Sequence, residues 1–276
     1  MITCENFNSE NYGRFGNQIF QYSICKILSK IHDTNFHLNP SRHFANFFDN
    51  SLTYKPFDFI HQQNQKYIED NPFEFDENLL SHNNIDIAGF FQNIKYYKNF
   101  TQIINKELKP NNKILNNARS YLKIKSQNCR LDKILTIHVR RRDYTNYKHI
   151  YNFISIKNYL KIIKNFNYDY LFIVSDDINS VKQEVMDLKL LLKNTIFVDD
   201  LDVYHQFYII YLANMNVLSN STFCWWSAYL SSMNTKKNIY APDPWVNNNK
   251  VNLYPPDWHK FSCNLFKWEQ LFYKDS

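Results

Sequence analysis

The chain has 276 residues, of which 44% are hydrophobic and 17% aromatic, and its formal net charge is +6. This length suffices for one large domain or two smaller ones with real cores. No apolar run reaches the roughly 18 to 20 residues that a membrane span needs, and the first residues do not resemble a signal peptide. We therefore expect a cytoplasmic protein; a peripheral position at a membrane surface stays open.

Glycine is unusually rare. The chain has three, Gly13, Gly16 and Gly89, where an average usage of about 7% would give roughly 19. Glycines that are retained in such a chain can mark backbone positions that need a positive φ or a close approach to a ligand. The five cysteines are far apart and form no C-x-x-C pair, so the sequence predicts neither a disulfide framework nor a zinc site.

The first half begins with a predicted strand over residues 1–7, a glycine loop over 13–18 and a helix whose apolar residues recur at helical spacing from 19 to 28. A loop of this kind aims backbone N–H groups at an anion or a polar ligand, although a tight turn alone explains the same spacing. Residues 30–84 show no clear period. A strand from residue 85 to Gly89 and a helix over 111–125 follow, before a plausible linker.

Strands and helices then alternate regularly, which is typical of a parallel, doubly wound α/β sheet. The predicted strands are 133–139, 170–174, 195–198, 216–219 and 238–241, and the helices between them end near 165, 192, 213 and 230. Ligands of such sheets bind beyond the carboxyl ends of the strands. The polar groups at 138–143, 175–177, 199–202 and 220–222 all follow strand ends, and this common position favours an anion site over a basic surface turn for Arg140, Arg141 and Arg142.

Each polar group also has a simpler explanation. Asn220, Ser221 and Thr222 offer hydroxyls and helix N–H groups to a phosphate, but they also suit a plain helix N-cap. Asp176 and Asp177 could bind a metal, although a helix N-terminus that accepts carboxylates is the favoured interpretation. Arginines that face a hydroxyl-lined helix N-terminus suit a nucleoside diphosphate, and two such halves suit a nucleotide-sugar transferase.

Six segments, in chain order, resemble motifs of the α-1,2-fucosyltransferases, glycosyltransferase family eleven. The matches run from about residue 13 to 245, nearly the whole chain, and together they are specific. They are GRFGNQIFQY at 13–22 for GxLGNQxFQY, GFFQ at 89–92 for GYFQ, HVRRRD at 138–143 for the HxRRxD signature, SDD at 175–177, NSTFCWW at 220–226 for NSTFSWW, and a later AP-x-x-W at 241–245.

The resemblance implies an α/β fold of the GT-B architecture, in which two Rossmann-like domains face each other across a cleft. Residues 1–128 would form the acceptor-side domain, and residues 129–276 the domain that binds GDP-fucose. The implied activity is that of a galactoside α-1,2-fucosyltransferase: inverting transfer of L-fucose from GDP-fucose to a 2-hydroxyl, commonly of galactose in a glycan acceptor. No metal is expected, because arginines can neutralise a diphosphate leaving group in place of Mg²⁺. The implied activity also needs no cofactor and no nucleic-acid partner.

The resemblance also implies roles for single residues. Arg140 and Arg141 would bind the diphosphate, and Arg141 would also stabilise the transition state. His138 would shape the signature loop, and Asp143 would orient an arginine or contact the nucleotide. The remaining substrate-binding candidates are Asn220, Ser221 and Thr222 as oxygen-binding groups, Asp176 and Asp177 for the nucleoside, and Gly16, Asn17 and Gln18 on the opposite domain, where Asn17 would meet the fucose or the acceptor.

The general base is less well indicated. No Asp or Glu occurs between Asp143 and Asp169, so His149 is the candidate proton acceptor; a plain loop histidine explains it equally well. Arg142 and Gln206 depart from the family pattern, which often has glycine and aspartate there, and we expect Arg142 to point to solvent. Two alternatives stay open: a GDP-sugar transferase of other linkage or sugar, and a non-catalytic basic binder of glycan or nucleic acid.

Overall fold

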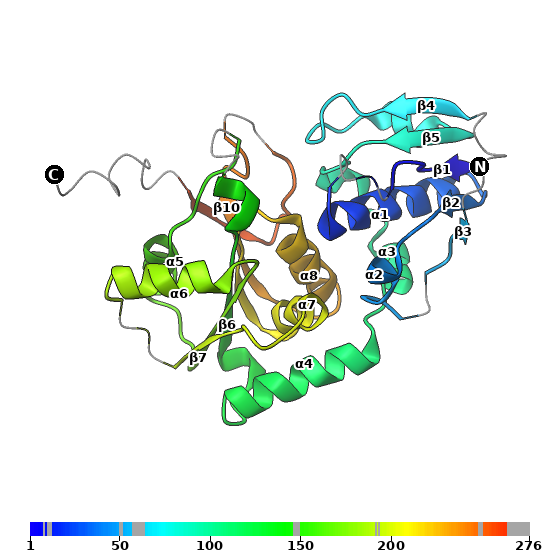
Figure 1. The fold of residues 1–276 in the computed structure, drawn as a ribbon. Helices are drawn as coiled ribbons and strands as arrows, with labels where there is room; N and C mark the ends of the chain where they lie inside the picture. The colour runs from blue at the N-terminus through cyan, green and yellow to red at the C-terminus, as the bar shows by residue number, and fades with distance from the viewer. Residues whose placement is uncertain are drawn as a thin grey trace.

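Two parallel β-sheets, one after the other along the chain, organise the protein (Figure 1). The computed structural model describes residues 1–7, 9, 13–49, 52–56, 64–145, 150–190, 192, 194–247 and 251–263. The first sheet is built from strands within 2–88 and the second from strands within 134–262. The predicted α/β class, with two Rossmann-like halves in the GT-B arrangement, is confirmed. Within the described ranges, no helix combines the length and apolar character needed to cross a membrane.

In the first sheet, the order in which the strands are added reverses at the centre, and this reversal is the switch point of the sheet. Its strand order is β3 (Lys55–Pro56), β2 (Phe36–Leu38), β1 (Ile2–Thr3), β5 (Ile85–Ala88) and β4 (Gln65–Ile68). The chain leaves β1 through helix α1 (Phe15–Ile31), which packs against β1 and β2. Strand β5 then returns to the other side of β1. The short helices α2 (Arg42–Ala45) and α3 (Thr101–Glu107) complete this half.

The second sheet repeats this plan with longer strands. Its order is β11 (His259–Ser262), β10 (Asn238–Asp243), β9 (Met215–Val217), β6 (Ile134–Val139), β7 (Tyr170–Ser175) and β8 (Thr195–Phe197). All six residues of the central strand β6 are buried, as expected of a parallel strand that is covered on both faces. The strand order reverses between β6 and β9, which is the switch point of this sheet.

Helices cover both faces of the second sheet. Helices α5 (Ile156–Ile163) and α6 (Ile178–Asp187) pack on the face to which β6 contributes Leu135, Ile137 and Val139. On the other face lie α7 (Val203–Leu212) and α8 (Thr222–Ser232), and α4 (Asn112–Lys125) packs against α7 (Figure 1). The predicted domain boundary at 128/129 falls just after α4, between the two sheets.

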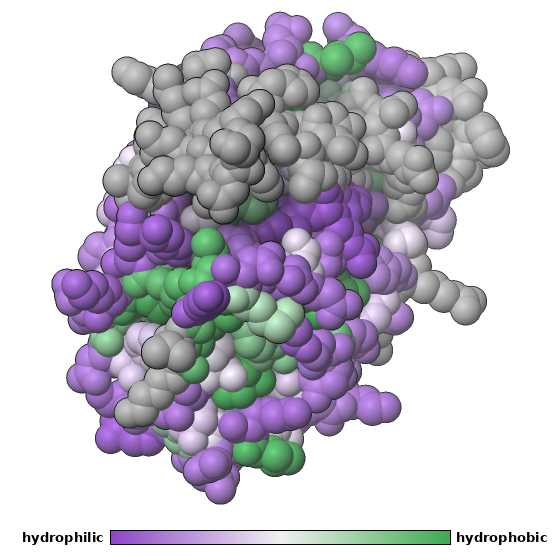
Figure 2. Space-filling model, turned by 60° about the vertical axis from the view of Figure 1, so that its left-hand side comes forward, coloured by the Kyte–Doolittle hydropathy of each residue, from purple (hydrophilic) through white to green (hydrophobic). Residues whose placement is uncertain are grey.

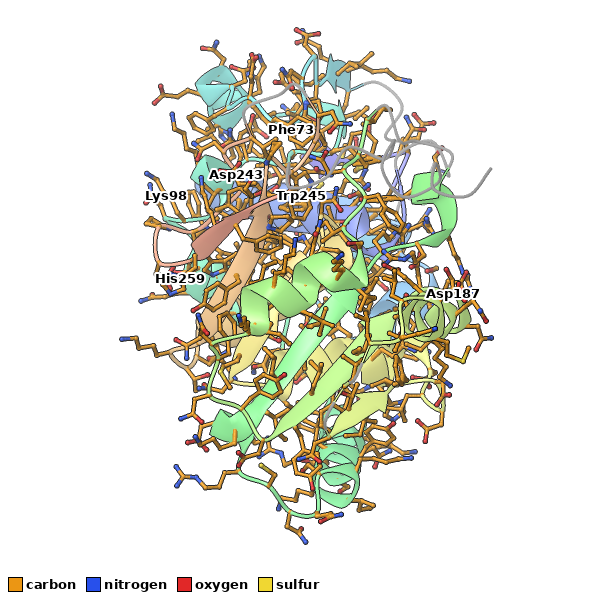
Figure 3. The ribbon with its side chains drawn as sticks, turned by 90° about the vertical axis from the view of Figure 1, so that its left-hand side faces the viewer. Phe73, Lys98, Asp187, Asp243, Trp245 and His259 are labelled. Carbon is orange, nitrogen blue, oxygen red and sulfur yellow. The ribbon has the colours of Figure 1, made fainter. Side chains whose placement is uncertain are left out.

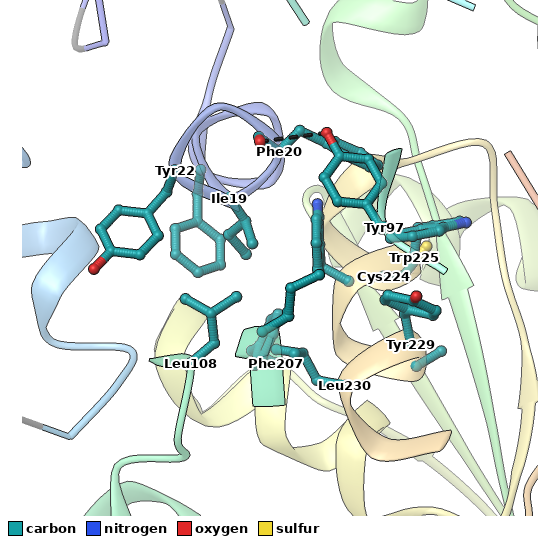
Figure 4. Packing of buried hydrophobic residues seen from close by; sticks show 14 of the residues in the cluster. Ile19, Phe20, Tyr22, Tyr97, Leu108, Phe207, Cys224, Trp225, Tyr229 and Leu230 are labelled. Carbon is teal, nitrogen blue, oxygen red and sulfur yellow. Dashed lines mark hydrogen bonds between the residues drawn. The ribbon is translucent and has the colours of Figure 1, made fainter. Parts of the chain in front are cut away.

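Helices α1 and α8, which belong to different halves, pack directly against each other (Figure 4). The ring of Phe20 lies 5.0 Å from that of Trp225 and 4.8 Å from that of Trp226. The N-terminal ends of these helices are closer still: a Cβ atom on Gly16 would lie 2.4 Å from the hydroxyl oxygen of Thr222 and 2.5 Å from its carbonyl carbon. Only glycine fits at such a backbone approach. The two halves therefore share one hydrophobic core.

Candidate active site

A cleft of about 1320 Å³ lies between the two halves, at the carboxyl ends of both sheets. Figure 2 shows hydrophilic residues around a recess at the middle of one face, beside the atoms drawn in grey. The cleft is bordered by the segments that follow β1, β4 and β5 in the first half and β6, β7, β9 and β10 in the second. Both switch points therefore open into one cavity, which is where ligands bind in open parallel sheets.

Arg140 follows the last residue of β6 and lines the cleft. Its Nη1 atom lies 3.0 Å from Oδ2 of Asp176, and 15% of its side chain is exposed. Its guanidinium carbon lies 5.2 Å from the centre of the Tyr144 ring, and Tyr144 stacks on Tyr151 at 4.3 Å. The Tyr144 hydroxyl donates to the carbonyl of Asn220. A carboxylate and an aromatic stack thus hold this guanidinium at the cleft wall.

Arg141 points the other way and does not line the cleft. Its side chain is 3% exposed, and its Nη2 atom lies 2.6 Å from Oε2 of Glu184 on α6. Its Nη1 atom donates to the carbonyls of Arg140 and Ile154, and its main-chain N–H donates to Asp176. Direct contact between Arg141 and a diphosphate, as predicted, does not fit this position. Arg141 instead fixes the loop that presents Arg140.

The sequence held a signal that distinguishes the two arginines. Side chains alternate between the faces of a strand, and odd-numbered residues of β6 face α5 and α6. Arg141 continues this odd series toward Glu184, while Arg140 continues the even series that includes His138. The sequence gives no sign of Glu184 itself, because a single glutamate on an amphipathic helix is ordinarily a solvated residue.

His138 is 97% buried beside Arg140, at the end of β6. Its Nδ1 atom lies 2.7 Å from the hydroxyl oxygen of Ser219, just beyond β9. Burial lowers the pKa of His138 to about 3, with a smaller contribution from the Arg140 charge. The imidazole is therefore neutral at pH 7 and joins the two strand ends at the switch point.

The N-terminus of α8 faces the same cavity. Asn220, Ser221 and Thr222 all line the cleft. Ser221 is the N-cap residue of α8, and its side chain makes no capping hydrogen bond to the N–H groups of the first turn. The Asn220 amide donates to the carbonyls of Asn152 and Trp245, so that side chain supports the loops around it. The first N–H groups of a helix favour an anion, and α8 presents them close to Arg140.

The first half contributes the loop that opens α1. Gly16, Asn17 and Gln18 line the cleft at the positions expected. The side-chain oxygen of Asn17 accepts a hydrogen bond of 3.0 Å from the Gln92 amide. Because α1 begins at Phe15, a second helix N-terminus reaches the cleft beside that of α8, where Gly16 approaches Thr222.

The remaining predicted residues divide into three groups. Asp176 lines the cleft but already binds both arginines, whereas Asp177 caps α6 by accepting from the Ser180 N–H and does not line the cleft. Arg142 is exposed and also lines the cleft. The Asp143 side chain and all of His149 lie outside the described residues. Where the structure describes the chain, no three His, Cys, Asp or Glu residues are grouped so as to hold a metal ion.

Several cleft residues were not predicted from the sequence. Three of them are aromatic, namely Phe73, Phe90 and Trp245. His43 also lines the cleft, and its Nδ1 atom lies 2.7 Å from the Tyr204 hydroxyl. Phe73 and His43 come from the stretch that showed no period, so no strand end marked their place.

A family model described as Glycosyl transferase family 11 matches residues 3–261. An Alpha-1,2-colitosyltransferase from Escherichia coli is 26% identical over an alignment 186 positions long, which covers 62% of this chain and 60% of that protein. The chain thus spans less than two thirds of that relative's length.

Solved structures with a similar arrangement include crystal structures of POFUT1 in complex with GDP-fucose and in complex with GDP. Each aligns with a TM-score of 0.49, at 12% and 13% sequence identity respectively. The alignments cover 87% of this chain and 96% and 97% of the two POFUT1 chains.

Proposed function

The chain belongs to glycosyl transferase family 11, and we propose that it transfers L-fucose from GDP-fucose to the 2-hydroxyl of a galactose in a glycan acceptor. The observation that carries the proposal is that Arg140 and the N-terminus of α8 line the same cleft at the switch point of the second sheet. This arrangement offers a guanidinium and backbone N–H groups to a nucleoside diphosphate.

In the transfer itself, one bond to C1 of the fucose forms and another breaks. The acceptor hydroxyl oxygen attacks C1 of the fucose from the face opposite GDP, and the bond from C1 to the β-phosphate oxygen breaks with inversion. GDP leaves with the electron pair of that bond. Arg140 and the helix N–H groups stabilise the charge that develops on the diphosphate. We assign the proton of the hydroxyl to His149, as expected from the sequence.

We propose that this charge stabilisation needs no divalent metal. Guanidinium groups form strong, charge-assisted hydrogen bonds with phosphate, and they act on the same leaving-group oxygens that Mg²⁺ would neutralise. Asp176, an acid in this part of the cleft, already lies 3.0 Å from Arg140. Its charge is therefore compensated by the protein.

The test is incubation of the protein with GDP-fucose and a β-galactoside in the presence of EDTA. We expect release of GDP and a product whose linkage, determined by NMR, is α-1,2. A parallel reaction with GDP-colitose is warranted because the curated relative is an α-1,2-colitosyltransferase. A protein that neither binds GDP nor transfers either sugar would contradict the proposal, and steep salt dependence without nucleotide preference would favour a non-catalytic basic binder.

A further inference from the structure

The segment Gly89–Gln92 follows β5 at the switch point of the first sheet. None of its residues takes part in the proposed transfer step. Phe90 and Gln92 line the cleft. Between them, Phe91 is fully buried and has a φ of +52°. A left-handed conformation is rare for a bulky aromatic residue, and such strain persists only where the surroundings impose it.

The surroundings impose it through a partly buried carboxylate. Glu69, just after β4, accepts the Phe90 N–H at 2.6 Å and the Phe91 N–H at 2.9 and 3.0 Å. The carbonyl of Phe91 accepts from the Tyr97 hydroxyl at 2.7 Å and from the Asn93 N–H at 3.0 Å. Both peptide groups that flank the strained residue are therefore fixed.

Gly89 makes room for this carboxylate. A Cβ atom at position 89 would lie 2.5 Å from the Glu69 Cβ and 2.6 Å from its Oε2, so a side chain there would displace the glutamate. Burial raises the pKa of Glu69 to about 7, although the two N–H groups act in the opposite direction. The carboxylate oxygens of Glu69 accept these hydrogen bonds from the backbone of a cleft segment.

Other aromatic residues line the cleft together with this segment. Phe73 from the first half and Trp245 from the second both line the cleft, and Figure 3 labels them one above the other in its view. The carbonyl of Phe73 is held at 2.7 Å by the Asn93 amide, so the same short stretch of chain positions both Phe73 and Phe90. Aromatic rings beside a few polar groups are the usual lining of a small-molecule subsite.

We propose that the segment 89–92, locked by Glu69, forms the acceptor subsite. Phe90 is the platform for the apolar face of a hexose, and Gln92, which also donates to Asn17, is its hydrogen-bonding side chain. Glu69 is a positioning residue that acts through the backbone of Phe90 and Phe91. This inference rests on the proposed function and assigns its acceptor to one wall of the cleft.

Two variants and one control test the subsite. Glu69→Gln replaces one acceptor oxygen by an N–H donor that faces a backbone N–H, and Phe90→Ala removes the platform. The matched control is Glu74→Gln, since Glu74 is exposed and pairs with Asn71 at 2.9 Å. The measurements are KM for the galactoside, kcat, and the Kd of GDP, together with galactoside binding to the GDP-loaded protein by saturation-transfer NMR.

We expect Glu69→Gln to raise KM for the galactoside about 10-fold, the scale of one lost hydrogen bond to a charged group. Phe90→Ala should raise KM by a similar factor of about 10, because the hexose loses its apolar contact. Both variants should leave the Kd of GDP within about twofold. Phe90→Tyr should restore KM, and the control should match wild type. Unchanged KM and unchanged galactoside binding in Phe90→Ala, with wild-type turnover intact, would overturn the subsite alone. A wild-type protein that binds GDP but transfers to no galactoside would overturn the proposed function, and the subsite with it.

Discussion

Arg140 and Arg141 are adjacent and chemically identical, yet their replacement by alanine should fail in different ways. Arg141 is 3% exposed, and its removal leaves Glu184 without its guanidinium partner. Breaking one partner of a buried ion pair costs about 3–5 kcal/mol. For a chain of this size, each kcal/mol lowers the Tm by about 2–4 °C, so we expect Arg141→Ala to lower the Tm by about 6–20 °C.

Arg140→Ala should instead lower the rate of the reaction and have little effect on stability. Its guanidinium lies at the cleft wall and forms an ion pair with Asp176, which keeps the N–H of Arg141 as a second donor. We expect a stability loss of about 1 kcal/mol, and a fall in kcat of about 10²- to 10³-fold, the cost of one transition-state donor. The Kd of GDP should also rise, because the diphosphate loses its guanidinium.

The assay combines thermal unfolding, GDP titration and steady-state GDP release for both variants. Glu184→Gln is the matched control: it should reproduce the Tm loss of Arg141→Ala in part, while any residual folded enzyme keeps near-normal GDP affinity. The opposite pattern would refute the assignment. That pattern is an Arg141→Ala protein with an unchanged Tm and lost GDP binding, beside an Arg140→Ala protein with normal kcat.

Three further predictions concern other parts of the molecule. Gly16→Ala would place a methyl group 2.4 Å from the Thr222 hydroxyl and 2.5 Å from its carbonyl carbon, so we expect about 1–3 kcal/mol of destabilisation, measured by urea unfolding; an unchanged midpoint would contradict the close approach. The folded pKa of Glu69 is about 7 against an ordinary 4.5, so its protonated form is favoured by folding and stability is lost as pH rises from about 4.5 to 7. Wild type should lose about 2–3 kcal/mol more than Glu69→Gln between pH 5 and pH 8, and parallel pH profiles would count against it. Dialysis against EDTA should leave GDP release within about twofold, and recovery that requires added Mg²⁺ would show that the arginines do not suffice.

Much of the second sheet could be predicted because its strands are short apolar runs. The predicted strands 133–139, 170–174 and 195–198 correspond to β6, β7 and β8 within one residue at each end. Parallel strands that are covered on both faces carry this continuous apolar signal, and the polar residues after them mark the cleft.

The edge strands β3 and β4 escaped prediction because they bury little surface. Strand β4 is exposed at three of its four residues, and both residues of β3 are exposed. Neither strand buries a full face, so neither shows a hydrophobic alternation. Strand β1 is only two residues long where a strand over residues 1–7 was expected. Glu69 and Phe73 follow β4, which explains why this wall of the cleft went unseen.

The three glycines do stand where the backbone needs them, but for two of them the close neighbour is the protein itself and not a ligand. Gly13 has a φ of +90°, but Gly16 and Gly89 are needed because a helix and a carboxylate of the protein itself come close to them. The count of a residue type can mark backbone crowding, but it cannot say whether the neighbour is a ligand or another segment of the chain.

The packing of α1 on α8 limits how this protein can be recombined. A chimaera joined near residue 128 would take α1 from one parent and α8 from the other. It would then have to match the Phe20 ring to foreign partners in place of Trp225 and Trp226, which lie within 5.0 Å of it. We therefore expect the two helices to be inherited as a pair, and donor and acceptor preferences to be exchanged between relatives by grafting loops rather than whole halves.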